Sequence, residues 1–113
     1  MSDKGSAAEE AAARFLTGRG LELLQRNYRC RFGEIDLILR DGRTLVFVEV
    51  RYRASKAFGG AAESITHAKR DKLLRAARHY MAEHQRFPAC RFDALLLDGD
   101  NDNVEWVTNA FGE

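Results

Sequence analysis

The chain has 113 residues, of which 45% are apolar and 31% charged, and its net charge is only +1. This length and apolar content predict a single domain, residues 1–113, with one core of modest size. Because no segment approaches the roughly 20 apolar residues of a membrane-spanning helix, and Met1–Lys4 contain no apolar stretch of a secretory signal, we expect a cytoplasmic protein without a membrane partner.

The first predicted elements are a helix and a strand. Ser6, with Glu9 three residues later, has the spacing of a capping box, so we expect a helix from Ser6 to about Arg19 that ends at Gly18 or Gly20. This reading makes Glu9 a capping residue, while its acid also suits metal binding, with Glu10 as a weaker substitute; both roles stay open. Residues 21–28 are predicted to form the first strand.

Two apolar runs on either side of Asp41-Gly42 predict a β-hairpin. If Asp41 and Gly42 form a two-residue loop, Asp36 pairs with Phe47, and Glu34 pairs with Glu49. Asp36 and Glu49 then become diagonal neighbours, which lie roughly 7–8 Å apart on one face of a sheet.

This hairpin predicts a site for a divalent metal. Glu34 and Glu49 are like charges expected to face each other, and a cation is the simplest compensation. Glu49 also lies in the apolar run 45–50, which is typical of a central strand, where a carboxylate needs a partner or a metal. The alternative is a solvated face on which Glu34 or Glu49 pairs with Arg51 or Arg53.

A loop, a helix and two strands are predicted after the hairpin. The loop covers residues 53–63, and Ser64 or Thr66 is expected to cap the helix, which finishes before Pro88. Residues 90–98 and 104–108 are predicted to be strands joined by an acidic turn. The apolar stripe of the helix consists of Ile65, Ala68, Leu73, Ala76, Ala77 and Tyr80.

Positive charge is concentrated in the middle of the chain. Residues 19–91 contain 16 Lys and Arg against 8 Asp and Glu, whereas residues 92–113 contain six acids and no bases. Such a distribution favours a phosphate backbone as partner, although bases on a helix can also be merely solubilising. The expected DNA-binding residues are Arg29, Arg31, Arg53, Lys56, Lys69, Arg70 and Arg75.

Motifs spread over nearly the whole chain resemble the YraN-type family of small bacterial proteins. That family is similar to the Holliday-junction-resolvase branch of the restriction-endonuclease-like, or PD-(D/E)xK, nucleases. The residues that carry the resemblance are Glu9, Asn27-Tyr28-Arg29, Gly33-Glu34-Ile35-Asp36-Leu37-Ile38, Val48-Glu49-Val50-Arg51, Phe58-Gly59, Lys69, Arg91-Phe92-Asp93 and Asn109-Ala110-Phe111.

The resemblance implies an α/β fold with a restriction-endonuclease-like core, in which helices flank a mixed central β-sheet in the order α-β-β-β-α-β-β. It also implies that Asp36 and Glu49 bind metal and that Glu9 adds an acid. Arg51 stands where lysine is usual, and because a guanidinium does not deprotonate in proteins, Arg51 is expected to hold the phosphate rather than accept a proton.

We therefore expect a Mg²⁺- or Mn²⁺-dependent endonuclease that cuts DNA, with branched or recombination-intermediate DNA as the favoured substrate. Glu9, Asp36, Glu49 and Arg51 are the expected catalytic residues, and the backbone carbonyl of Val50 is a further candidate ligand. The alternatives are a non-catalytic DNA-binding or accessory recombination and repair protein with the same fold, and a structural adaptor. The sequence leaves the oligomeric state open, with a homodimer among the arrangements considered.

Overall fold

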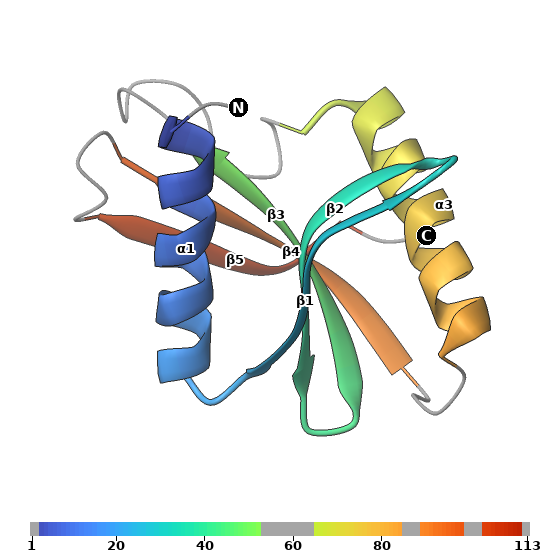
Figure 1. The fold of residues 1–113 in the computed structure, drawn as a ribbon, viewed down its shortest axis with the longest axis horizontal. Helices are drawn as coiled ribbons and strands as arrows, with labels where there is room; N and C mark the ends of the chain where they lie inside the picture. The colour runs from blue at the N-terminus through green and yellow to red at the C-terminus, as the bar shows by residue number, and fades with distance from the viewer. Residues whose placement is uncertain (1–2, 53–64, 85–88, 99–102, 112–113) are drawn as a thin grey trace.

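The elements occur in the predicted order in the computed structural model, which describes residues 3–52, 65–84, 89–98 and 103–111. Two helices and five strands are found in these ranges (Figure 1). They are α1 (Asp3–Gly18), β1 (Glu22–Cys30), β2 (Gly33–Asp41), β3 (Thr44–Tyr52), α3 (His67–Glu83), β4 (Ala89–Leu97) and β5 (Val104–Phe111). The predicted loop 53–63 and the predicted breaker Pro88 lie outside the described residues.

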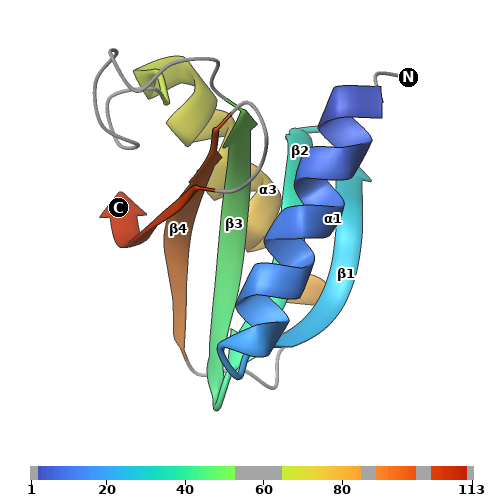
Figure 2. The same ribbon diagram turned by 90° about the vertical axis from the view of Figure 1, so that its left-hand side faces the viewer.

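The five strands form one sheet in the order β1-β2-β3-β4-β5, with α1 on one face and α3 on the other (Figures 1 and 2). Neighbouring strands are antiparallel except β3 and β4, which are parallel. The mixed sheet flanked by helices is therefore confirmed, while its assignment as a restriction-endonuclease-like core stays a prediction. Neither described helix is long and apolar enough to cross a membrane.

Strand β3 lies at the centre and is buried on both sides. Leu45 and Phe47 contact the layer of α3, whereas Val46 and Val48 contact the layer of α1. This alternation follows from the two-residue period of a strand. Glu49 continues the α3 side of the strand, at a point where only 4% of the residue is exposed.

The start of α1 differs from the prediction. The helix begins at Asp3 and runs through Ser6, so Ser6 is not its N-cap and Glu9 lies in the second turn. The extension covers Asp3-Lys4-Gly5, and nothing in the local sequence explains it. The capping reading of Glu9 is thus wrong.

The ends of the helices were predicted more accurately. Helix α1 stops at Gly18, one of the two expected positions. Thr66 caps α3, because its hydroxyl accepts a hydrogen bond from the backbone N–H of Lys69 at 3.1 Å. Ser64, the alternative cap, lies outside the described residues.

The predicted hairpin forms, but its register is displaced by two residues. Asp41 pairs with Thr44, so the loop is Gly42-Arg43 rather than Asp41-Gly42. Gly42 has a φ of 62°, and a glycine with positive φ at the first loop position is what a type II′ turn requires. A displacement of two residues leaves the side chains of the paired residues on their predicted faces. Before Leu37 the alternation of β2 breaks, because Ile35 and Ile38 both pack in the layer of α3.

Strands β2 and β3 separate after the pair formed by Leu37 and Val48, the last in their ladder. Beyond it, β2 pairs with β1 back to Gly33, while β3 stays paired with β4 as far as Tyr52. The predicted pairing of Glu34 with Glu49 is therefore wrong. We call the opening between residues 33–36 of β2 and residues 49–52 of β3 the fork.

A bend of the β1–β2 hairpin toward α3 accompanies this separation (Figure 1). Asn27 in β1 has a φ of 51°, a left-handed conformation that asparagine tolerates better than most residues. At the hairpin end, a Cβ on Gly33 would lie 3.5 Å from the Cβ of Lys72 on α3. That distance is an ordinary van der Waals contact, so space does not require glycine here; its φ of 152°, which L side chains rarely adopt, does.

Asp93 in β4 anchors β5 at the other side of the sheet. Its carboxylate is fully buried and accepts hydrogen bonds from Trp106 Nε1 at 3.0 Å and from the backbone N–H of Asn109 at 2.8 Å. Arg91 Nε lies 3.1 Å from the same group and supplies the opposite charge. Asn109 has a φ of 53°, so Asp93 satisfies the backbone where β5 is irregular.

We expect Asp93→Ala to lower the free energy of unfolding by about 2–4 kcal/mol, because the change removes the acceptor of two partly buried N–H donors and leaves Arg91 with Asp41 as its ion-pair partner. Urea denaturation followed by circular dichroism measures this loss. The control is Asp71→Ala, which removes an exposed carboxylate paired with Arg75 at i,i+4 and should cost less than about 0.5 kcal/mol. A loss below about 1 kcal/mol in Asp93→Ala would contradict the anchoring role.

Candidate metal centre

Asp36 lies at the apex of the fork. It directly precedes Leu37, the last residue of β2 that pairs with β3. Its Oδ2 accepts a hydrogen bond from the backbone N–H of Val50 at 2.9 Å. The side chain of Asp36 thus serves as the acceptor that a partner strand would otherwise supply, and this bond places a carboxylate between the two strands.

Glu49 supplies the second carboxylate. The carboxyl group of Glu49 lies close enough to Asp36 that, in addition to burial, its charge and hydrogen-bonding capacity raise the pKa of Asp36. No donor among the described residues reaches Oε1 of Glu49, and that oxygen is buried. When both groups are ionised, Oε1 therefore needs a cation, since a buried acceptor without a partner is costly.

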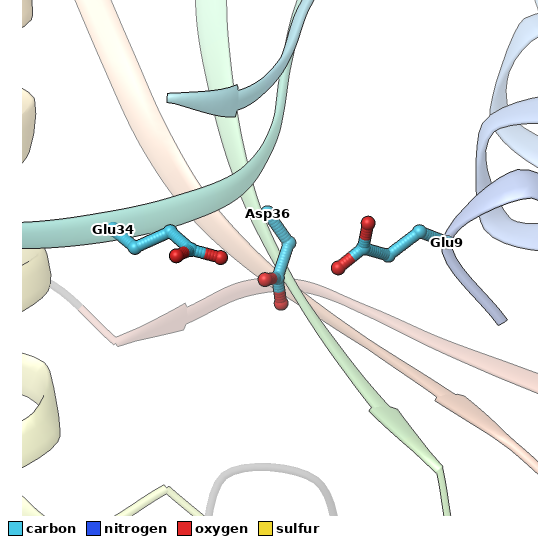
Figure 3. Close-up of side chains that lie close together, drawn as sticks. All are labelled: Glu9, Glu34 and Asp36. Carbon is cyan, nitrogen blue, oxygen red and sulfur yellow. The ribbon is translucent and has the colours of Figure 1, made fainter. Parts of the chain in front are cut away.

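Glu9 and Glu34 complete an acidic group around Asp36. One carboxylate oxygen from each of these three residues lies within 4.8 Å of the other two. Glu9 extends from α1, Glu34 precedes Asp36 in β2, and their carboxylates point toward Asp36 from opposite sides (Figure 3). Asn27 forms a side-chain hydrogen bond with Glu9, so the bend in β1 also supports the acid from the helix.

The electrostatics of the fork favour a bound cation. Burial and then the charge of Glu49 raise the pKa of Asp36 from 3.8 to about 7, despite the opposing effects of the Val50 N–H and the Lys69 charge. Burial and then the charge of Asp36 raise the pKa of Glu9 as well. The clustered ligands are all oxygens, the type that Mg²⁺ and Mn²⁺ prefer.

Two cations lie beside Glu49. Lys69 Nζ is 3.4 Å and Arg51 Nη1 is 3.8 Å from the same oxygen, Oε2. The structure therefore brings together the four predicted catalytic residues Glu9, Asp36, Glu49 and Arg51, and adds Lys69 to them.

The predicted DNA-binding residues are placed in different settings. Arg29 bonds Glu34 at 2.9 Å, and Arg31 lies over the ring of Phe32 with its guanidinium carbon 4.8 Å from the centroid. Arg53 and Lys56 lie outside the described residues.

On α3, Arg70 donates from Nε to the carbonyl of Ile65 at 3.1 Å and packs over Phe111, with its guanidinium carbon 5.6 Å from the ring centroid. Arg75 is largely exposed and pairs with Asp71 on the same helix. Of these two predicted DNA contacts, Arg75 is the one whose charge faces solvent without supporting the fold.

Three features of the site escaped the sequence analysis. Glu34 was recognised as a like-charge problem but not as part of the acidic group, and Lys69 was assigned to DNA rather than to Glu49. Asn27 was noted without a role, although the tolerance of asparagine for positive φ is a usable signal. The contact between Lys69 and Glu49 joins α3 to β3, and no local pattern reports it.

Comparison with known proteins gives a consistent result. Residues 8–97 match the model described as Uncharacterised protein family UPF0102. A UPF0102 protein of Nitrosomonas europaea is 59% identical over 112 residues, which cover 98% of this chain and 95% of the relative. A UPF0102 protein of Methylobacillus flagellatus is 53% identical over 112 residues, covering 98% of each chain. The matched range includes every residue of the fork.

We expect Asp36→Asn to stabilise the metal-free protein at alkaline pH. Between pH 3.8 and about 7 the folded state holds a proton on Asp36 that the unfolded state releases, so this group lowers stability as pH rises and its full penalty applies above pH 7. With a chelator, Asp36→Asn should therefore melt roughly 5 °C above wild type at pH 8, and the difference should vanish toward pH 4.

Asp36→Ala is the matched control for this measurement. Asparagine keeps an oxygen acceptor for the Val50 N–H, whereas alanine removes it, so Asp36→Ala should not gain the same stability. Melting of Asp36→Asn below wild type at pH 8 with a chelator would mean that the carboxylate is a structural partner rather than part of an ion site.

Proposed function

The chain is a member of the Uncharacterised protein family UPF0102, and we propose that it is a Mg²⁺- or Mn²⁺-dependent endonuclease that cuts DNA. The convergence of Glu9, Glu34 and Asp36 beside the buried, donor-free Oε1 of Glu49 supports this proposal most directly. Membership confirms the resemblance to YraN-type proteins at the level of the family. The resolvase-like nuclease branch belongs to the proposal.

Asp36 and Glu49 are the principal ligands in this proposal, and Glu9 is an additional one. Asp36 is suited to this role because it contacts both Glu49 and the Glu9–Glu34 side of the group. A bound divalent ion would supply Lewis-acid chemistry, by lowering the pKa of water and neutralising charge on the phosphate. The acids would bind the ion and cannot neutralise a phosphate. The negative charge that develops on the phosphate would therefore also need basic side chains of the chain.

In this proposal Arg51 binds the scissile phosphate. Its guanidinium lies beside Glu49, and 38% of its side chain is exposed. A guanidinium can grip a phosphate with two parallel hydrogen bonds, but it does not release a proton in proteins. Arg51 would therefore orient and neutralise the phosphate, and it would not accept the proton of the attacking water.

DNA would approach from the side where the β1–β2 hairpin meets α3, since several basic residues lie on these two elements.

Branched DNA is favoured over linear duplex only by the resemblance to resolvases, so the substrate must be tested directly. A single assay should compare linear, flap and four-way-junction DNA with Mn²⁺, Mg²⁺ and chelator, with Asp36→Asn as the inactive reference. Absence of cleavage of all three substrates by wild type would favour the rival proposal, a non-catalytic DNA-binding or accessory recombination protein.

Substitutions at Arg51 distinguish phosphate binding from proton transfer. Arg51→Lys should keep measurable activity because it keeps a cation, whereas Arg51→Ala should lose on the order of 10²–10³-fold in cleavage rate, the usual cost of one transition-state donor. The rates should be measured at saturating DNA. An inactive wild type together with an active Arg51→Lys would show that the site needs lysine chemistry at this position.

Reversal of an exposed charge on α3 tests the DNA-binding face. Arg75→Glu should weaken binding to labelled junction DNA and lower the slope of log Kd against log salt by about 1, because phosphate contacts release counterions. Fluorescence anisotropy at several salt concentrations measures both effects.

Arg14→Glu is the control with the same change of charge. Arg14 is exposed on α1, on the opposite face of the sheet, and pairs with Glu10 at 3.4 Å. If Arg14→Glu and Arg75→Glu changed the salt slope equally, the effect would come from net charge and not from a DNA-binding face on α3.

A further inference from the structure

We propose that Lys69 is the second phosphate-binding cation of this site and contacts the scissile phosphate together with Arg51. This inference rests on the proposed nuclease function and names a further catalytic residue for it. The sequence analysis grouped Lys69 with Arg70 and Arg75 as contacts to the DNA backbone. Its position in the structure distinguishes it from both.

The first argument is geometric. Lys69 from α3 and Arg51 from β3 approach the same oxygen of Glu49, at 3.4 and 3.8 Å. Charge-assisted hydrogen bonds are usually about 2.7–2.9 Å long, so neither cation is closed tightly onto Glu49. An ammonium has three donors, and one carboxylate oxygen at this distance occupies at most one of them. The Lys69 side chain is also 41% exposed, so that an incoming phosphate can reach it.

The second argument concerns the helix. Lys69 lies in the first turn of α3, where the helix dipole disfavours a positive charge, and that turn contains no acidic residue. Its backbone N–H is the group that Thr66 caps, so the start of the helix holds the residue in a defined position. A lysine at this position does not stabilise the helix. We therefore attribute its presence to its contact with Glu49 of β3.

The third argument is the charge of the fork. Four carboxylates, those of Glu9, Glu34, Asp36 and Glu49, surround the place where a phosphate must meet the ion. Cations next to this group reduce the repulsion that an anionic substrate would meet. The charge of Lys69 reaches across the fork, since it also acts on Asp36. Arg75, by contrast, pairs with Asp71 on its own helix, and both side chains are largely exposed.

The experiment compares Lys69→Met and Lys69→Arg with wild type. The rate of single-turnover cleavage with Mn²⁺ at saturating DNA should fall on the order of 10²-fold in Lys69→Met and should be largely restored in Lys69→Arg, while Kd for DNA changes less than about threefold. A residue that merely contacts the backbone would show the reverse, a weaker Kd with an unchanged rate, and this result would overturn the proposal.

A second measurement needs no DNA and no cleavage. Removing a cation close to the metal ligands should tighten Mn²⁺ binding by roughly threefold to tenfold in Lys69→Met, measured by calorimetry with the metal alone. Arg14→Met removes a positive charge from α1 and should leave Mn²⁺ affinity unchanged. Circular dichroism of each variant excludes misfolding as the cause of any loss.

The two measurements separate failure of this inference from failure of the proposed function. An unchanged Mn²⁺ affinity in Lys69→Met would overturn the placement of Lys69 even if the wild type cuts DNA. If the wild type cuts no substrate, the nuclease proposal fails, and the phosphate contact of Lys69 falls with it.

Discussion

The hydrogen bond from the Val50 N–H to Asp36 is the interaction on which the candidate site depends. Strand β3 loses its β2 partner after Val48, and the next backbone donors in a half-buried strand need an acceptor. Asp36 supplies that acceptor from its side chain. Separation of the strands and insertion of a carboxylate between them are therefore one structural event, which also brings Glu34 into the acidic group; the packing of α1 and α3 brings Glu9 and Lys69 to the fork.

Asp93, which is buried, and Asp36, which is half-buried, show how differently the same side chain is treated in this fold. Asp93 is enclosed by donors from Arg91, Trp106 and Asn109, so its negative charge is satisfied and the sheet gains an anchor. Asp36 has one backbone donor and faces other acids, which raise its pKa instead. The repulsion among the carboxylates around Asp36 lowers the stability of the folded protein, and clustered acids of this kind are typical of functional sites.

The order and type of most helices and strands were predictable, because apolar residues repeat every two residues in a strand and every three to four in a helix. Asp36 and Glu49 were expected to lie together, and they do, although the predicted hairpin register was wrong by two residues. Within the paired part of the hairpin, an error of two residues preserves the face of each side chain. The start of α1 was misplaced because the spacing of Ser6 and Glu9 is a local signal that also occurs inside a helix, where these residues lie.

The rest of the site could not be derived from local patterns. Glu34 joins the acids only because β2 leaves β3, and Lys69 meets Glu49 only because α3 packs on that face of the sheet. Both contacts depend on where two elements far apart in sequence come together. Residue type predicted which side chains carry chemistry, and the tertiary packing determined which of them meet.

Trp106, the only tryptophan of the chain, contacts both Asp93 of β4 and Phe15 of α1. Its indole N–H is bonded to Asp93, and its ring meets Phe15 of α1 edge-on, with centroids 6.0 Å apart. Helix α1 also carries Glu9 to the fork. The protein therefore contains its own optical probe, because the fluorescence emission of one indole reports both the anchoring of β5 and the docking of the helix that delivers an acid to the fork.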